Sequence, residues 1–448
     1  MIGKIVNILK SILPEFLYNG LKVIYKGLKP ILKSLHTFYF IIKLIKVQAN
    51  HKKALEIVRK KGKIKVIFLL IQESVWKYEG VYGLMRQHER FEPIVVVCPY
   101  ISYGTKVMIT TMNQAYNAFK AKGYDVIKSF NEITGEWIDV KKELKPDLLF
   151  FTNPYFLTSK NYTILNFKKC LTFYVPYGFM ITNRPKMQYN QLLHNLVYMI
   201  FHETTFQQIQ AQKYSQNKGK NSVVTGYPGL DLFFEKNIKD SSNDIWKTKN
   251  KSMKKIIWAP HHTIEKDNGL FNYSNFLHYY SFFLDIADKY KDNLIISFKP
   301  HPILKAKLYK HPEWGVERTN NYYNEWKKRA NCRLHEGDYV ELFISSDAMI
   351  HDSGSFLVEY ICTNKPSLYM VRHQSVLTGF SDLGNEIIDC HYKSFSQKDV
   401  RKFIEDVING DDFLKMKREI LISKYLKPPF GKSASENIMD VLINLISE

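Results

Sequence analysis

The chain has 448 residues, of which 45% are hydrophobic and 14% aromatic, and its net charge is +21. This composition is sufficient for the cores of two ordinary domains and excludes a chain that is disordered throughout. The five cysteines are scattered, odd in number and without CxxC spacing, which argues against a disulfide framework or a zinc site and favours a reducing compartment.

Much of the positive charge lies near the N-terminus. Residues 1–65 contain fourteen lysines and one arginine against Glu15 and Glu56, and apolar side chains recur near helical spacing between the lysines, with breaks at Pro14 and Pro30. This pattern predicts a basic amphipathic helical extension, residues 1–60, that lies on an anionic membrane surface; the alternative is that it packs on the protein or on another subunit. No row of aromatic side chains accompanies the lysines, so we expect no nucleic-acid partner.

No apolar run in this extension is long enough to cross a bilayer. A spanning helix needs about 20 apolar residues in a row, and no run here approaches that length. The segment also lacks the small-residue cleavage site of a secretory signal. We therefore expect a peripheral protein on the cytoplasmic face of the cell membrane.

From Lys65 the pattern changes to alternating strands and helices. Buried strands are predicted at residues 66–71, 91–97, 124–127, 147–151 and 171–175, and helices between them include one after the loop 72–83 and one at 113–122. This alternation predicts a doubly wound Rossmann-like domain in residues 61–245, whose ligand loops gather at the carboxyl ends of the strands. The turn Pro176–Phe179 belongs to that edge.

A polar stretch at residues 236–255 is predicted to link this domain to a second one. A new alternating series follows, with strands at 255–260, 294–298, 347–350 and 365–371 and helices at 276–290 and 356–362. It predicts a second Rossmann-like domain in residues 246–448, facing the first across a cleft. Ser433 and Glu436 have the spacing of a capping box before a helix at 438–446, and we expect the C-terminal helices to pack back on the first domain.

Two motifs in the second half contain residue types that are suited to binding phosphate groups. Lys299-Pro300-His301-Pro302 follows one predicted strand, and His351-Asp352-Ser353-Gly354-Ser355-Phe356 follows another and opens a helix. Small hydroxyl residues and glycine at a strand-to-helix turn leave backbone N–H groups exposed, where the helix dipole favours a phosphate. We interpret the pair as a diphosphate cradle. The alternatives are that Ser353 and Ser355 are simple N-caps, and that the Pro-His-Pro segment is a rigid turn with a surface imidazole.

Together with Trp258-Ala259-Pro260 and Glu359-Tyr360, these motifs resemble the C-terminal half of the CDP-glycerol glycerophosphotransferase family, over about residues 255–375. That family makes teichoic acids and related surface polymers on a two-domain glycosyltransferase-B scaffold. The chain departs from the family in two places. Asp352-Ser353-Gly354-Ser355 stands where the family usually has Asp-Tyr-Ser-Ser, and Tyr177-Gly178 stands where it has a His-Gly pair whose histidine is the proposed base.

The resemblance implies a transferase that moves a polyol phosphate, glycerol phosphate foremost, from a CDP-activated donor to a lipid-linked or growing cell-surface polymer, with release of CMP. One alternative is a nucleotide-sugar glycosyltransferase, because the same scaffold and diphosphate turn serve that chemistry. A second alternative is a non-catalytic scaffold at the membrane, which the tyrosine in place of histidine suggests.

Phosphoryl transfer depends on positioning and on positive potential, because its transition state spreads charge over the phosphoryl oxygens. We expect Lys299 and His301 to supply that positive potential, and either His261 or His262 to transfer a proton. Glu359, one helical turn beyond the cradle, is expected to accept the donor ribose hydroxyls; alternatively it is solvated or paired with Arg372. The expected donor-binding residues are Lys299, Asp352, Ser353, Gly354, Ser355 and Glu359.

On the acceptor side, the sequence offers Glu79 from the first loop and the Tyr177-Gly178 turn. Ordinary loop packing is the alternative for Glu79, and a turn with a packed ring is the alternative for Tyr177. No Asp-x-Asp motif lies near a strand end, so we expect neither a metal nor another cofactor.

Overall fold

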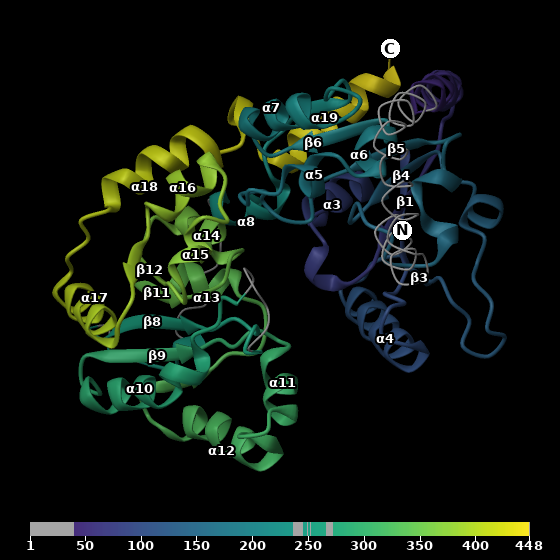
Figure 1. Ribbon diagram of the computed structural model, residues 1–448. Coiled ribbons are helices and arrows are strands. Elements are labelled where there is room, and N and C mark those ends of the chain that lie inside the picture. Colours follow the sequence, from purple (N-terminus) through teal and green to yellow (C-terminus); the bar gives the residue numbers. More distant parts are fainter. Residues whose placement is uncertain (1–39, 236–244, 249, 251, 266–271, 448) are drawn as a thin grey trace, which may run out of the picture.

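The computed structural model describes residues 40–235, 245–248, 250, 252–265 and 272–447, which form two parallel β-sheets flanked by helices (Figure 1). The predicted helix breaks at Pro14 and Pro30 lie outside the described residues, as does most of the predicted linker 236–255.

The first sheet has seven strands in the order β3-β2-β1-β4-β5-β6-β7. Its central strand β1 pairs in parallel with β2 and β4, so that Ile67 lies between Ile94 and Leu149. Helices cover both faces, which explains why β1 is a nearly continuous apolar run. The strands are β1 (Ile64–Leu70), β2 (Phe91–Val97), β3 (Val126–Lys128), β4 (Leu148–Phe151), β5 (Leu171–Tyr174), β6 (Met199–His202) and β7 (Ser222–Val224).

The second sheet has six strands in the order β10-β9-β8-β11-β12-β13. Its core is aromatic: the Trp258 ring stacks between Phe283 and Phe298, with centroid distances of 4.1 and 5.0 Å. The strands are β8 (Lys254–Ala259), β9 (Leu294–Phe298), β10 (Cys332–Leu334), β11 (Ala348–His351), β12 (Ser367–Met370) and β13 (Tyr392–Ser394).

Both sheets reverse their strand order once, between β1 and β4 in the first and between β8 and β11 in the second. Successive connections leave the sheet in opposite directions at such a point, which is where open α/β sheets generally bind their ligands. The prediction of two doubly wound Rossmann-like units is confirmed.

The helices that cover the sheets are mostly short. In the first half they are α3 (Glu79–Gln87), α4 (Thr105–Ala121), α5 (Pro185–Tyr189), α6 (Leu192–Leu196), α7 (Thr205–Tyr214) and α8 (Asp231–Phe234). In the second half and at the C-terminus they are α10 (Phe276–Lys289), α11 (Leu304–Lys310), α12 (Gly315–Lys328), α13 (Val340–Ser345), α14 (Phe356–Glu359), α15 (Gln374–Leu377), α16 (Asp382–Ile388), α17 (Gln397–Asn409), α18 (Lys415–Leu421) and α19 (Ala434–Ser447).

Several boundaries differ from the sequence prediction. The helix predicted at 113–122 begins at Thr105, and α3 begins at Glu79, inside the predicted loop. The helix predicted at 356–362 ends at Glu359, because Asn364 adopts a left-handed conformation (φ 56°) after a 3₁₀ turn and Pro366 disfavours helix at the residue before it. The short strands β6, β7, β10 and β13 were not predicted, since three or four residues carry little periodic signal.

The C-terminal helix α19 crosses to the first half and packs against α3 (Figure 1). Its predicted capping box is confirmed: Glu436 N donates to Ser433 Oγ at 3.1 Å, and Ser433 N donates to Glu436 Oε2 at 2.7 Å. Asp231 reinforces this end of the helix, because its carboxylate accepts the backbone N–H groups of Ala434 and Ser435 at 2.8 and 2.9 Å. The last helix is thereby fixed to the first half of the molecule.

Residues 40–59 form a helix on the first half. Its buried side includes Phe40 and Val47, whereas three isoleucines on it, Ile41, Ile42 and Ile45, are 47%, 50% and 60% exposed. Within the part of the chain that the structure describes, no helix combines the length and apolar character that crossing a bilayer requires.

The two halves are joined by packed side chains and by backbone. One hydrophobic cluster contains Ile181 and Tyr227 from the first half and Leu357 and Leu383 from the second. Thr182 and Phe380 form an isolated antiparallel bridge between the halves. The two halves are thus held in contact through residues outside the edge strands of the sheets.

Candidate active site

The predicted motifs of the second half meet at the reversal point of its sheet. His261 and His262 follow β8, the Lys299–His301 segment follows the neighbouring strand β9, and the Asp352–Ser355 loop follows β11 on the other side of β8. All these strands are parallel, so their carboxyl ends share one edge. Three loops that are distant in sequence therefore surround one location.

Asp352 holds this arrangement together. Its Oδ1 accepts the backbone N–H of His261 at 2.6 Å, and its Oδ2 accepts that of Asn275 at 2.6 Å. The side chain is only 1% exposed, and burial raises the pKa of the carboxyl to about 7. Both oxygens are occupied within the chain, so the carboxylate fixes the loop after β8 and the start of α10 to the end of β11.

Three imidazoles form a compact cluster. The ring centroids of His262 lie 4.3 Å from His261 and 4.2 Å from His301, and those of His261 and His301 are 5.2 Å apart. One ring nitrogen from each histidine lies within 4.8 Å of the others. Among the described residues, these three are therefore a possible ligand set for a metal ion, judged by residue type and distance alone.

The cluster is uncharged at neutral pH in the free protein. Burial, reinforced by the neighbouring imidazoles and by Lys307, lowers the pKa of His261 to about 2, and burial with His262, Lys299 and Lys307 lowers that of His301 to about 3. Burial and Lys307 also lower the pKa of His262. The expectation that His301 supplies positive potential therefore needs a bound anion that would raise its pKa; without one the ring offers only an N–H dipole.

Lys299 is 6% exposed and does not extend freely into solvent. Its Nζ donates to the carbonyl of Gly337 at 3.1 Å and lies 5.7 Å from the centroid of the Tyr339 ring. Burial lowers the pKa of the ammonium, and Asp338 and Glu336 oppose that effect. The charge is thus held against the loop that follows β10.

The predicted cradle loop is compact and partly open. Ser353 Oγ lies 3.3 Å from Ser355 Oγ, and a Cβ added at Gly354 would meet no atom of the described residues within 4 Å. His351, at the end of β11, is fully buried, and its Nδ1 lies 3.1 Å from the Ser353 carbonyl. The small residues leave space beside the loop while the histidine beneath fixes its backbone.

Glu359 lies between the two halves of the molecule. It is 6% exposed, its Oε1 is 3.8 Å from Lys77 Nζ of the first half, and its Oε2 has no hydrogen-bond partner among the residues that the structure describes. Burial raises the pKa of this carboxyl, and Lys77 opposes the increase. The alternatives of a solvated Glu359 or an Arg372 pair are wrong, because the fold brings a lysine from the other half to this carboxylate.

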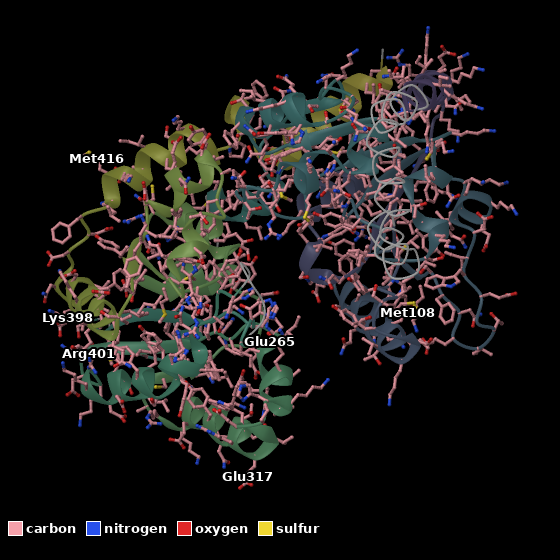
Figure 2. The ribbon with its side chains drawn as sticks, viewed as in Figure 1. Met108, Glu265, Glu317, Lys398, Arg401 and Met416 are labelled. Atoms are coloured by element: carbon pink, nitrogen blue, oxygen red, sulfur yellow. The ribbon has the colours of Figure 1, made fainter. Side chains whose placement is uncertain are left out.

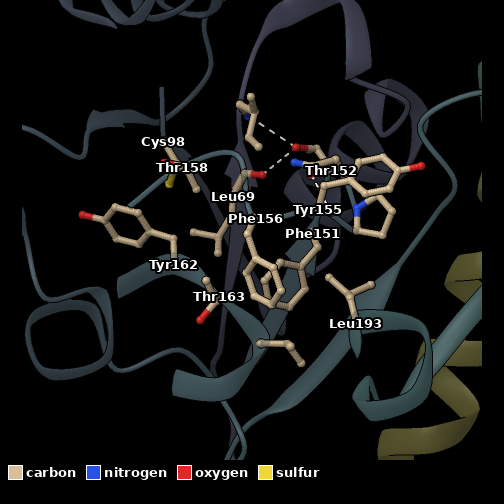
Figure 3. A pocket seen from close by; sticks show the side chains of 14 residues that line it. Leu69, Cys98, Phe151, Thr152, Tyr155, Phe156, Thr158, Tyr162, Thr163 and Leu193 are labelled. Atoms are coloured by element: carbon tan, nitrogen blue, oxygen red, sulfur yellow. Dashed lines mark hydrogen bonds between the residues drawn. The ribbon is translucent and has the colours of Figure 1, made fainter. Parts of the chain in front are cut away.

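The first half has a small, partly open pocket at its own reversal point (Figure 3). Thr152 braces the point where β1 and β4 diverge: its Oγ1 donates to the Leu69 carbonyl at 2.8 Å and accepts the Ile71 N–H at 3.3 Å. Most of the lining is apolar or aromatic, but Thr158 Oγ1 is buried there, and no described residue forms a hydrogen bond with it. The lining residues are Leu69, Ile71, Cys98, Phe151, Thr152, Asn153, Pro154, Tyr155, Phe156, Thr158, Tyr162, Thr163, Ile164 and Leu193.

Two of the three predicted acceptor-side residues lie next to this pocket. The hydroxyl of Tyr177 is 3.5 Å from that of Tyr155, a lining residue, and Gly178 follows it in a turn with open space beside its Cα. Glu79 begins α3 instead and accepts a hydrogen bond from Trp76 Nε1 at 3.2 Å. The structure therefore associates the Tyr177 turn with the pocket and Glu79 with the packing of Trp76.

Sequence reasoning missed several residues that shape these sites. Thr263 lies 3.0 Å from His261 Nδ1, and Asn275 shares Asp352 with His261. Lys77 and Tyr155 meet their partners from distant parts of the chain. Only the position of Thr263, two residues beyond His261, carried a local signal; the others depend on tertiary contacts.

The side of the second half that carries Glu265 faces the first half (Figure 2). Glu265 forms an ion pair with Lys307, and both residues influence the pKa of His262. The three imidazoles thus lie near the side on which the two halves approach each other.

Comparisons with known proteins agree with this architecture. A family model described as CDP-Glycerol:Poly(glycerophosphate) glycerophosphotransferase matches residues 65–441. No curated protein sequence matches the chain.

Among solved structures, an S. aureus MnaA-UDP complex has a TM-score of 0.54 and 17% identity, covering 86% of this chain and 98% of that chain. A variant of the wall teichoic acid polymerase TagF has a TM-score of 0.54 and 13% identity, covering 92% and 98%. UDP-GlcNAc 2-epimerase from Neisseria meningitidis bound to UDP-GlcNAc has a TM-score of 0.53 and 15% identity, covering 85% and 100%. At these identities the likeness shows a shared two-domain fold, that of the glycosyltransferase-B type.

Proposed function

The chain belongs to the CDP-glycerol:poly(glycerophosphate) glycerophosphotransferase family, and from this premise we propose that it transfers glycerol phosphate from CDP-glycerol to a lipid-linked or growing cell-surface polymer, with release of CMP. The family match makes it a glycerophosphotransferase-like transferase and confirms the resemblance of its motifs. The donor, the acceptor and the leaving group are our proposal.

The observation that carries the proposal is the convergence of three loops at the reversal point of the second sheet. The His261–His301 ring distance of 5.2 Å and the hydrogen bond from His261 to Asp352 bring the β8, β9 and β11 loops to one place. A diphosphate needs several donors on different sides, and the meeting of three loops at one place supports this assignment.

On the donor side, we assign contact with the diphosphate to His261, His301 and the loop Ser353–Ser355. Lys299 contributes a positive charge that is fixed against the loop after β10, and Asp352 acts indirectly by holding the His261 loop in place. We assign Glu359 to accept ribose hydroxyls, because its Oε2 is buried without a hydrogen-bond partner among the described residues. Proton transfer at this site belongs to one of the remaining imidazole nitrogens.

On the acceptor side, we assign the pocket at the reversal point of the first sheet. It lies at the carboxyl ends of β1 and β4, beside Tyr155 and the Tyr177-Gly178 turn, and its buried Thr158 hydroxyl is available to a hydroxylated ligand. Apolar walls with a few polar groups are typical of small-ligand sites.

We also propose that the protein works at the cytoplasmic face of the membrane, where a lipid-linked acceptor resides. The exposed isoleucines of the helix at 40–59 and the lysines between and beside them, Lys43 and Lys46, form a surface suited to anionic lipid.

The test is CMP release by purified full-length protein from CDP-glycerol and a lipid-linked acceptor. We expect His301→Ala to reduce the rate by about 100-fold or more, as is usual for loss of a donor to a transferring group. His311→Ala is a matched control, because His311 also precedes a proline and also accepts a backbone N–H at Nδ1, from Glu313 at 3.2 Å, yet is not a member of the imidazole cluster.

The outcomes separate the alternatives. UDP release from a nucleotide sugar, without CMP release from CDP-glycerol, would reject our proposal in favour of a glycosyltransferase. Polymer production in cells that is unaffected by His301→Ala would favour a non-catalytic scaffold.

A further inference from the structure

The hydrogen bonds of Thr263 determine which nitrogen of His261 carries the proton. Thr263 Oγ1 accepts the backbone N–H of Tyr273 at 3.0 Å and that of Ser274 at 3.3 Å. A hydroxyl has two lone pairs and one hydrogen, so two accepted bonds leave Thr263 only its hydrogen to offer. His261 Nδ1 lies 3.0 Å from the same oxygen and must therefore be the acceptor.

The same conclusion holds for His301 from a different partner. Its Nδ1 accepts the backbone N–H of Ile303 at 3.2 Å. A neutral imidazole has one N–H and one lone pair, so a ring whose Nδ1 accepts has its proton on Nε2. Two of the three clustered rings thus present Nε2–H donors, with their centroids 5.2 Å apart.

We propose that Thr263 is a positioning residue that holds His261 in the Nε2–H tautomer, so that His261 and His301 together present two N–H donors to the phosphoryl oxygens of the donor diphosphate. This inference rests on the proposed function and names how that site recognises its anion. It also assigns the proton-acceptor role, left open between the two adjacent histidines, to His262, because His261 has no free lone pair in this tautomer.

The arrangement selects an anion over a metal ion. A metal ligand must offer a lone pair, and its other nitrogen usually donates to a carbonyl or carboxylate. Here the Nδ1 atoms of His261 and His301 accept hydrogen bonds, so their Nε2 atoms carry protons that a cation would have to displace. A phosphoryl oxygen instead accepts from both N–H groups without any change of tautomer.

The experiment measures the tautomer directly and its effect on anion binding. Long-range ¹H–¹⁵N correlation spectra of full-length protein labelled at histidine should show a protonated-type Nε2 for His261 at neutral pH. We expect Thr263→Val to change that signature and to weaken binding of inorganic diphosphate by about 5-fold or more, the effect of losing one hydrogen bond. Thr263→Ser should retain both properties.

Thr363→Val is the matched control, since Thr363 also accepts a backbone N–H, from Lys365, and donates to a carbonyl, that of Tyr360, away from the imidazoles. It should leave the His261 signature and diphosphate affinity unchanged. If Thr263→Val does not fold, the spectrum of the unmodified protein still decides, because an unprotonated Nε2 of His261 overturns the inference.

Two further results would overturn it. One is a diphosphate affinity in a folded Thr263→Val protein equal to that of the unmodified chain. The other is a visible Co²⁺ absorption band that disappears in His262→Ala, which would identify a metal site. Because these readouts need neither acceptor nor turnover, absence of CMP release would reject the proposed function while leaving this inference testable.

Discussion

At the residue scale, the number of histidines says little about the charge that they carry, because burial keeps several of them neutral. A buried imidazole whose pKa is lowered stays neutral in the folded protein at pH values where the unfolded chain binds a proton. His51, His194 and His391 are buried in this way, with pKa values lowered to about 4, 3 and 3 by burial. A sequence reveals the histidines but not this loss of charge.

His391 gives the clearest pH prediction. Its Nδ1 lies 2.6 Å from Ser367 Oγ and its Nε2 2.9 Å from the Leu357 carbonyl, both in the core. Between pH 6.5 and about 3 only the unfolded state binds this proton, so the free energy of unfolding falls as the pH falls through that window.

We expect His391→Gln to lower the free energy of unfolding at pH 7. We also expect it to reduce the slope of that free energy against pH, between pH 6 and pH 4.5, by up to ~1.4 kcal/mol per pH unit. Urea denaturation at several pH values measures both. Identical slopes for the variant and the unmodified protein would mean that His391 is protonated in the folded state.

At the element scale, strands that the sheet buries on both faces were predictable, and short connecting elements were not. The strand β1 is recognisable as an apolar run, and it sets the position of every neighbour through its pairing with β2 and β4. The strand β10, by contrast, exists because its three residues pair with β9. Pairing of that kind depends on the rest of the sheet and leaves no periodic pattern in the sequence.

The contact between α3 and α19 shows an element position that only glycine permits. A Cβ built on Gly80 of α3 would lie 2.5 Å from Ser435 Oγ and 2.8 Å from Ser435 Cβ, whereas one built on Gly83 would meet nothing within 4 Å. The two glycines are about one turn apart on the same helix, so their backbone conformations are alike and they differ in what packs against them.

We therefore expect Gly80→Ala to destabilise the protein by ~1–3 kcal/mol through overpacking. Gly83→Ala, its control on the same helix, should instead stabilise by about 0.5–1 kcal/mol, because alanine favours helix. Urea denaturation of the two variants checks the opposite signs. Stabilisation by Gly80→Ala would show that α19 packs further from α3 than the structure has it.

At the scale of the whole molecule, the fold brings together a site that the sequence presents in pieces. The three motif loops were predictable as loops after strands, and their meeting follows from the strand order. The contacts that complete the site, such as Thr263 with His261 and Lys77 with Glu359, depend on side-chain geometry or on pairing across the two halves. A charge on one half and a carboxylate on the other have no common signal in the sequence.

The helix at 40–59 offers a test of where the molecule works. Its buried side and the hydrogen bond from Arg59 Nε to the Leu445 carbonyl, at 3.0 Å, fix it to the first half and to α19. Ile41, Ile42 and Ile45 therefore project from a rigid support (Figure 1 shows the helix in purple beside the C-terminus). Apolar side chains held this way gain from insertion into a lipid interface, and nearby lysines add attraction to anionic headgroups.

We expect the combined variant Ile41→Asn, Ile42→Asn, Ile45→Asn to reduce sedimentation of full-length protein with phosphatidylglycerol vesicles by about 10-fold or more, since a buried isoleucine contributes ~1.5–3 kcal/mol when fully transferred. Ile133→Asn is the control, because Ile133 is 96% exposed and belongs to a separate loop after β3. Vesicle binding that is equally weak in both variants would show that replacing any exposed isoleucine by asparagine weakens binding, wherever it lies on the surface. Binding that is unchanged in the triple variant would place the membrane contact elsewhere on the molecule.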